Sequence, residues 1–142
     1  MTAVKNNKTI TESAVTVIGT GNTPLNLVGP VEDRDYFFDG PLAELDTPEF
    51  SELTSLVSPI ASTSLVDTVG ALAMGDEEGL NSTQLESVRA QIESAKSKGI
   101  GARYWETPGW PVRTRNQIWR TLLKEGVALL NADDLEATKK FF

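Results

Sequence analysis

The sequence predicts an α/β fold in which parallel strands are joined by crossover helices, and residues 101–135 give the clearest evidence for it. Residues 102–105 are strand formers that end at the turn residues 106–109. A helical pattern follows, with apolar side chains on one face at Ile118, Trp119, Leu122 and Leu123. Gly126 ends that pattern, and residues 127–130 form a second apolar run. Strand, helix and buried strand in this order are typical of a parallel βαβ unit.

Three earlier runs predict further strands. Residues 14–18 (AVTVI) are apolar and mostly β-branched, and a Gly-Thr-Gly turn follows, so a buried strand is expected. Residues 36–38 (YFF) form a shorter run that ends at Asp-Gly-Pro. Residues 57–65 (VSPIASTSL) predict a third strand, because their proline lies near the start, where a missing N–H donor is tolerated. Together with the two strands of the C-terminal unit, five strands are expected.

The helices are expected to be short in the first half of the chain. Residues 22–34 contain two prolines and a glycine, which leave no room for a regular helix. Residues 42–56 are expected to form one or two short helices, and residues 67–74 a helical turn. Residues 75–79 (GDEEG) are expected to be an acidic surface loop, and the spacing of Asp76, Glu77 and Glu78 matches no calcium loop.

The longest predicted helix follows that loop. Thr83 and Glu86 have the spacing of a capping box, and Gly99 supplies a stop. Apolar side chains repeat at helical spacing at Leu85, Val88, Ile92 and Ala95. After the C-terminal βαβ unit, residues 136–142 are expected to begin a terminal helix or to form a tail.

Length and composition indicate one folded unit without a linker. The chain has 142 residues, fewer than the about 250 of a complete (β/α)8 barrel. Residues 1–13 are polar and are expected to be a flexible lead-in, with residues 14–142 forming the folded unit. They lack the apolar segment of a signal peptide, and no apolar run approaches the about 20 residues of a membrane span. A soluble chain is therefore expected, and its compartment stays open.

Composition also excludes several kinds of chemistry. The net charge of −7 argues against a nucleic-acid partner, because binding phosphate backbones requires a basic face. Cysteine is absent, so neither disulfides nor thiol catalysis applies. Histidine is absent too, which removes the commonest general base and the commonest transition-metal ligand.

The candidate binding residues are the polar side chains at the predicted strand ends. They are Asp39, Ser62, Ser64, Trp105, Glu106, Asn131 and Asp133. If the sheet is parallel, they gather along the rim at the carboxyl ends of the strands, where such folds keep their sites. Structural alternatives stay open for each kind of residue. Asp133 or Asp134 could cap the following helix, the two serines could bond loop backbone, and Trp105 could belong to the core.

Two further patterns bear on the site. In the segment 105–111 (WETPGWP), a tryptophan followed at once by turn residues indicates a flat apolar wall beside the rim, suited to the glycerol, sugar or acyl part of a ligand. Trp119, by contrast, has core spacing. Gly19 and Gly21 after a strand imitate a dinucleotide-binding fingerprint, but Pro24 occupies the position of its third glycine. An ordinary strand-to-loop turn is the preferred interpretation.

Residues 102–135 (ARYWETPGWPVRTRNQIWRTLLKEGVALLNADDL) resemble the C-terminal end of the fungal family called altered inheritance of mitochondria protein 6. That family is grouped with phospholipase C-like and glycerophosphodiester phosphodiesterase-like TIM barrels. The shared pattern is a strand with a tryptophan, a helix, Gly-Val, an apolar strand and an aspartate. It falls here on Trp105, Gly126-Val127, Leu129-Leu130 and Asp133. VTVIGTGNTPLNLV, YFFDGPL and SPIASTS occur upstream in the same order, so the resemblance covers about residues 14–135.

The resemblance implies a partial TIM barrel, about its C-terminal half, and metal-dependent hydrolysis of a phosphodiester small molecule or lipid headgroup. In that chemistry carboxylates hold a divalent cation, Mg²⁺ or Ca²⁺, and histidines supply acid and base. The family carries those histidines and its first metal-binding carboxylates in the N-terminal half of the barrel, which has no counterpart here. The resemblance assigns a role in the substrate pocket to Trp105 alone, and it matches Asp133 only to a position in the shared motif.

The expectation is therefore the C-terminal half of a phosphoric diester hydrolase-like barrel, as a truncated product or a fragment, without activity alone. The catalytic residues are unknown, and no metal ligand is assigned. A half barrel has two open sheet edges, so self-association through them is expected. The alternatives are a non-catalytic ligand-binding or interaction module and, ranked last, a dinucleotide-binding fragment.

Overall fold

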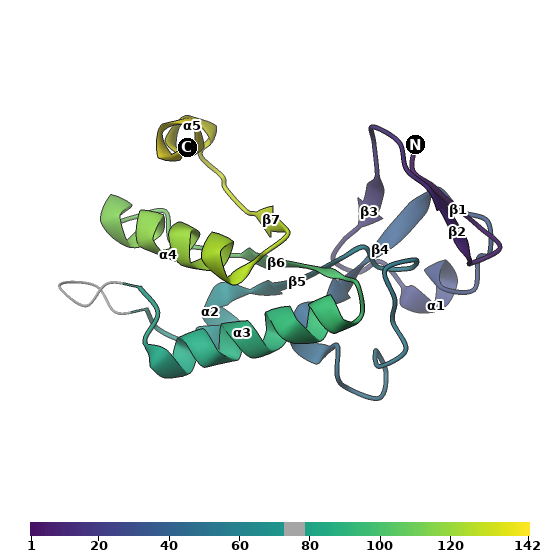
Figure 1. Cartoon of the computed structure of the whole chain (residues 1–142), viewed down its shortest axis with the longest axis horizontal. Helices are drawn as coiled ribbons and strands as arrows, with labels where there is room; N and C mark the ends of the chain where they lie inside the picture. The colour runs from purple at the N-terminus through teal and green to yellow at the C-terminus, as the bar shows by residue number, and fades with distance from the viewer. Residues whose placement is uncertain (73–78) are drawn as a thin grey trace.

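The computed structural model of the chain describes residues 1–72 and 79–142 (Figure 1). Over these residues, the strands are β1 (Ala3–Lys5), β2 (Thr9–Thr11), β3 (Val17–Gly19), β4 (Tyr36–Pro41), β5 (Ile60–Ser64), β6 (Gly101–Trp105) and β7 (Leu129–Leu130). The helices are α1 (Leu25–Val28), α2 (Leu65–Val69), α3 (Ser82–Ser97), α4 (Val112–Glu125) and α5 (Leu135–Phe141), with a 3-10 turn, η1 (Leu42–Glu44).

The predicted parallel α/β architecture is confirmed. Strands β3 to β7 lie in sequence order in one sheet, and every neighbouring pair is parallel. Helix α3 connects β5 to β6, and α4 connects β6 to β7, as crossover connections between parallel strands require (Figure 1). The sheet curls into a half-barrel. Within the described chain the sheet is not closed, because β3 and β7 are its two edges.

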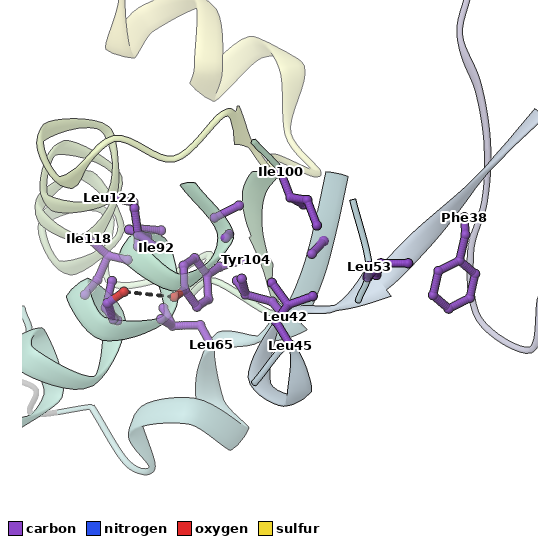
Figure 2. Close-up of a cluster of buried hydrophobic side chains, with 14 of the residues drawn as sticks. Phe38, Leu42, Leu45, Leu53, Leu65, Ile92, Ile100, Tyr104, Ile118 and Leu122 are labelled. Carbon is purple, nitrogen blue, oxygen red and sulfur yellow. Dashed lines mark hydrogen bonds between the residues drawn. The ribbon is translucent and has the colours of Figure 1, made fainter. Parts of the chain in front are cut away.

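One face of the sheet carries the hydrophobic core. Successive side chains of a strand point to opposite faces, and Ala102 and Tyr104 of β6 point to the face that α3 and α4 cover. Tyr104 lies among side chains of both helices, Ile92, Ile118 and Leu122 (Figure 2). Its hydroxyl donates a 2.9 Å hydrogen bond to Gln91 Oε1 of α3, and burial raises the pKa of Tyr104 above its ordinary value. The opposite face of β6 therefore presents Gly101, Arg103 and Trp105.

The ends of the two long helices, α3 and α4, agree with the sequence-based prediction except at the start of α3. Helix α3 does have a capping box, but Asn81 and Gln84 form it, two residues before the expected Thr83 and Glu86. The side chain of Gln84 also donates to the carbonyls of Val69, at the end of α2, and of Ala71, which fixes the cap at that position. Helix α4 ends at Gly126, whose φ of 95° lies in the left-handed region that glycine adopts most easily.

The first strand of the sheet differs from the expected buried strand at residues 14–18. Strand β3 begins only at Val17, which is 41% exposed, and Val15 before it is 56% exposed. The reason is position, since β3 is an edge strand that pairs with β4 alone. An apolar β-branched run does not distinguish an edge strand from a central one.

Residues 1–13, expected to be a flexible lead-in, contain the antiparallel hairpin of β1 and β2. Val4 exchanges two backbone hydrogen bonds with Arg34, and its side chain is fully buried. The Arg34 guanidinium donates to Asn7 Oδ1 and to the carbonyls of Val31 and Leu56. The hairpin is thus bonded to the segment that leads into β4.

Smaller differences concern the short elements. Strand β7 is two residues long, where residues 127–130 were expected, and Leu129 is half exposed rather than buried. One turn of helix, α1, forms within residues 22–34, where no helix was expected. Helix α2 starts two residues before the predicted turn at residues 67–74. The acidic trio, Asp76, Glu77 and Glu78, lies outside the described residues. No helix in the described ranges is long and apolar enough to cross a membrane.

Candidate functional site

A cavity of about 600 Å³ lies at the carboxyl ends of the parallel strands, and we call it the rim pocket. Its lining residues are Thr20, Gly21, Asp39, Arg103, Trp105, Glu106, Asn131 and Asp133. Five of the seven residues predicted from the sequence are among them. The other two, Ser62 and Ser64, are bonded to lining residues rather than lining the cavity themselves.

Strand register explains why these residues meet. Arg103 of β6 is aligned with Ser62 of β5 on one side and with Leu129 of β7 on the other. Asp39 of β4 is aligned with Ile60 of β5. Ile60 lies two residues before Ser62 and therefore points to the same face of β5. Because Phe38, Ala61 and Ala102 point into the core, their neighbours Asp39, Ser62 and Arg103 point to the other face.

Arg103 is the centre of the polar contacts in the rim pocket. Its Nη2 donates a 2.5 Å hydrogen bond to Asn131 Oδ1, and its Nη1 donates a 3.3 Å bond to Ser62 Oγ. Its Nη1 also lies 3.9 Å from Asp39 Oδ2, an ion pair too long to be a hydrogen bond. The guanidinium is thereby held by residues of β5, of β4 and of the segment after β7.

Asp39 is the most perturbed carboxyl of the rim pocket. Its side chain is 10% exposed, and Oδ1 is buried with no hydrogen-bond partner among the described residues. Burial raises the pKa of Asp39 above its ordinary value of 3.8, while the Ser62 hydroxyl and the Arg103 charge act in the opposite direction. A buried carboxylate with an unpaired oxygen is costly, so Asp39 binds a proton more readily than an exposed aspartate does.

Ser64 and Glu106 connect the ends of two neighbouring strands. The Ser64 hydroxyl donates a 2.6 Å hydrogen bond to Glu106 Oε2 and accepts one from the backbone N–H of Asp67, which caps α2. Glu106 itself has a φ of 58°, in the left-handed region that non-glycine residues rarely adopt. The serine fixes a carboxylate whose backbone has an unfavourable conformation, at the mouth of the rim pocket.

The structure separates the three tryptophans. Trp105 lines the rim pocket and is 41% exposed, so the alternative of a core role does not apply to it. Trp119 is buried on α4, as its spacing predicted, and packs edge to face with Phe141. Trp110 is 73% exposed and is absent from the lining of the rim pocket.

The structure also distinguishes the capping residue from the pocket residue among the two C-terminal aspartates, Asp133 and Asp134. Asp134 caps α5, since its Oδ1 accepts a 2.9 Å hydrogen bond from the Ala137 N–H. Asp133 lines the rim pocket, and it is not the cap.

Gly21 has a φ of 62° and lines the pocket through the turn after β3. Helix α1, which follows that turn, has four residues, too short to hold a pyrophosphate in the manner of a dinucleotide fold.

Arg103 was not among the residues predicted from the sequence. A signal for it existed, because it lies two residues before Trp105 in the same strand and must share its face. The run 102–105 is predicted only as a set of strand formers, whereas its alternation places Arg103 on the face opposite Tyr104.

A divalent cation does not fit the carboxylates of the residues that the structure describes. The described residues contain no group of three or more His, Cys, Asp and Glu side chains close enough to hold a metal ion. Asp39 faces the guanidinium of Arg103, and Glu106 accepts a hydrogen bond from the Ser64 hydroxyl. Mg²⁺ and Ca²⁺ require several oxygen ligands around one point. A cation at this rim would need ligands from outside the described residues.

Comparison with known proteins reveals fungal relatives. The chain is 58% identical to the altered inheritance of mitochondria protein 6 homolog of Arthroderma benhamiae over 142 residues, covering 100% of this chain and 44% of that protein. It is 36% identical to altered inheritance of mitochondria protein 6 of Eremothecium gossypii over 133 residues, covering 89% of this chain and 34% of that protein. The corresponding protein of Candida glabrata is 27% identical over 143 residues, covering 93% and 35%.

The matches cover most of this chain but only part of each relative. The chain spans less than half the length of these curated relatives. No protein-family profile matches the chain. No solved structure matches it either. The three relatives named here carry that one name, and this chain is homologous to part of each of these fungal altered inheritance of mitochondria protein 6 proteins.

Proposed function

We propose that the rim pocket binds the phosphodiester group of a small molecule or lipid headgroup, as part of a phospholipase C-like or glycerophosphodiesterase-like barrel. One observation carries the proposal. Among the eight residues that line a cavity of about 600 Å³, Arg103 is the one cation, and it lies at the carboxyl ends of parallel strands. In sheets of this kind the carboxyl ends of the strands are where ligands bind.

Arginine suits this ligand for a geometric reason. Its guanidinium presents five N–H donors in a planar fork that matches two oxygens of a phosphate. The hydrogen bonds of Arg103 to Ser62 and Asn131 use one N–H each of Nη1 and Nη2. Those bonds orient the fork, and the other N–H groups are available to a ligand. Trp105, exposed at the wall of the same cavity, offers a flat surface to the non-phosphate part.

The barrel itself is part of the proposal. Five parallel strands in sequence order, curled into a half-barrel, correspond to about half of a (β/α)8 barrel. The coverage of 44% of a relative's length is consistent with a second portion of similar size in such proteins. That portion would bring the acid and base for hydrolysis, since this chain has no histidine. The chain alone is therefore proposed to bind the diester without hydrolysing it.

The test is binding of glycerophosphoglycerol, a phosphodiester that carries a single negative charge, measured by isothermal titration calorimetry. We expect saturable binding that Trp105→Ala weakens about tenfold, because the flat wall is lost. Trp110→Ala is the matched control, since Trp110 is exposed outside the rim pocket. Absence of saturable binding, or an equal effect of the two substitutions, would contradict the proposal.

The second candidate is a ligand-binding or interaction module without any catalytic parent. The observation that favours it is the lack of a metal-binding group of side chains in the described residues. The two candidates differ in one measurement. If the parent is a hydrolase, the corresponding full-length protein of a relative cleaves glycerophosphoglycerol in the presence of Mg²⁺ or Ca²⁺, whereas a binding module leaves the diester intact at every metal concentration.

A further inference from the structure

The charges around the rim pocket do not favour an anion, and this contrast leads to a further inference. Arg103 faces three carboxylates in one cavity, those of Asp39, Glu106 and Asp133. Glu106 and Asp133 lie on segments after the strands, at the outer part of the rim. Asp39 lies within β4, is nearly buried, and is the carboxylate that approaches Arg103. An anion that binds Arg103 must therefore come close to Asp39.

The carboxyl oxygens of Asp39 are not fully paired by the residues that the structure describes. Its Oδ2 is 3.9 Å from Arg103 Nη1, beyond hydrogen-bond distance, and its Oδ1 has no hydrogen-bond partner in the described part of the chain. Two negatively charged oxygens close together in a buried site repel each other, and a proton shared between them removes the repulsion. A protonated carboxyl also becomes a hydrogen-bond donor.

We propose that Asp39 determines the specificity of the rim pocket by taking up one proton from solvent when an anion binds Arg103. The neutral carboxyl then donates a hydrogen bond to the oxygen that the guanidinium holds. No covalent bond of the ligand changes, and the proton returns to solvent when the ligand leaves. This inference rests on the proposed function, because it describes how the same pocket accommodates a phosphodiester.

The preference that follows is for a ligand with one negative charge. A phosphodiester keeps a single charge across the neutral range, whereas a phosphomonoester acquires a second charge near pH 6. The second charge of a monoester would face the carboxylates of Glu106 and Asp133 in the same cavity. One proton on Asp39 compensates one charge and leaves the other opposed. The rim pocket should therefore discriminate between diesters and monoesters above that pH.

Charged and polar groups from several elements surround Asp39 in the rim pocket. On β6 the neighbouring charge is the guanidinium of Arg103, and on β5 the neighbour is the uncharged Ser62. The turn after β3 contributes Thr20 and Gly21, also uncharged. Of the lining residues, Glu106 and Asp133 are the remaining titratable groups. Burial already raises the pKa of Asp39 before any ligand is present.

The first experiment is calorimetric titration of the unmodified chain with glycerophosphoglycerol, in two buffers of different ionisation enthalpy, between pH 4.5 and 7.5. The ligand has no titrating group in this range, so any proton taken up belongs to the protein. We expect each bound ligand to bring an uptake of nearly one proton at pH values between two limits. The lower limit is the pKa of Asp39 in the free protein, and the upper limit is its higher pKa in the complex. In that interval Kd rises up to about tenfold per pH unit.

Variants assign the proton to Asp39. Asp39→Asn should abolish the uptake and make Kd independent of pH. Asp133→Asn is the matched control, because it removes one charge from the same cavity and should leave the uptake in place. Glycerol 3-phosphate supplies the specificity test. At pH 7.5 it should bind at least tenfold more weakly than the diester, and at pH 5, where it carries one charge, it should bind about equally.

Each result decides between the two proposals. Saturable binding of the diester without proton uptake, or equal uptake in Asp39→Asn, overturns the inference about Asp39 and leaves the proposed function standing. Absence of saturable binding overturns both. If Asp39→Asn fails to fold, the two-buffer titration of the unmodified chain and the comparison of diester with monoester still decide the inference.

Discussion

The Ser64 hydroxyl donates a 2.6 Å hydrogen bond to Glu106 Oε2, joining the ends of two parallel strands at the mouth of the rim pocket. The glutamate is otherwise held in an unfavourable backbone conformation, with a φ of 58°. A left-handed conformation costs a residue with a Cβ about 1–2 kcal/mol, a cost that glycine avoids. Glu106 thus combines a fixed carboxylate with stored backbone strain, a combination typical of binding sites.

Replacing Glu106 separates the strain from the carboxylate. Glu106→Ala and Glu106→Gly both lose the bond to Ser64, but only glycine relieves the backbone. We expect the glycine variant to be more stable than the alanine variant by about 1 kcal/mol in urea denaturation. Equal stabilities would show that the conformation of Glu106 costs nothing.

Tyr104 tests the core behind the rim pocket. Tyr104→Phe removes the hydroxyl that donates to Gln91 Oε1 and leaves that partly buried acceptor with the longer 3.4 Å bond from the Thr68 hydroxyl. The free energy of unfolding should fall by about 1 kcal/mol. Tyr36→Phe is the control, since Tyr36 is exposed at the start of β4, and its unfolding midpoint should not change.

Val4 tests whether the N-terminal hairpin belongs to the folded unit. Its side chain is fully buried and its backbone is bonded to Arg34, so Val4→Ala should destabilise the chain by about 2 kcal/mol. Ile10→Ala, in the exposed strand of the same hairpin, should change the stability by less than about 0.5 kcal/mol. Proteolytic removal of the hairpin without loss of the cooperative transition would contradict this role.

Asp39 gives the stability a pH dependence with a definite sign. Its pKa in the folded chain is raised, so the folded state holds the proton more tightly than the unfolded state does. The contribution of Asp39 to stability is therefore complete below its ordinary pKa of 3.8 and is lost as the pH rises through the raised value. Asp39→Asn should melt higher than the unmodified chain at pH 7 and about equally at pH 3.5, and a constant difference at both pH values would show that burial does not perturb this carboxyl.

Local sequence patterns were sufficient to predict those elements of the fold that depend on contacts between residues close in the chain. The helical spacing of Ile118, Trp119 and Leu122, the glycine stop of α4 and the parallel order of the strands all follow from short-range periodicity, and the structure has them. The residues gathered at the rim follow from the same argument, because parallel strands end at one edge. The Asn81–Gln84 cap was missed although it is local, since a second capping pattern overlapped it two residues later.

Long-range contacts explain what the sequence did not indicate. Residues 3–11 look like a polar lead-in, and their order depends on Arg34, a partner about thirty positions away. The edge position of β3 depends on which strand lies beside it rather than on its composition. Arg103 became the centre of the rim pocket only through neighbours on β5, β4 and the segment after β7. No property of the single strand shows that arrangement.

The most direct test of the rim pocket is the effect of Arg103→Gln on the Kd for glycerophosphoglycerol. Glutamine keeps a hydrogen-bond donor and removes the charge, and Arg89→Gln on α3, outside the rim pocket, is the control for lost charge. The predicted result is a 10- to 100-fold rise in Kd for Arg103→Gln, about 1.5–3 kcal/mol, with no rise for the control. Equal Kd values for Arg103→Gln and the unmodified chain would contradict binding of the phosphodiester at Arg103.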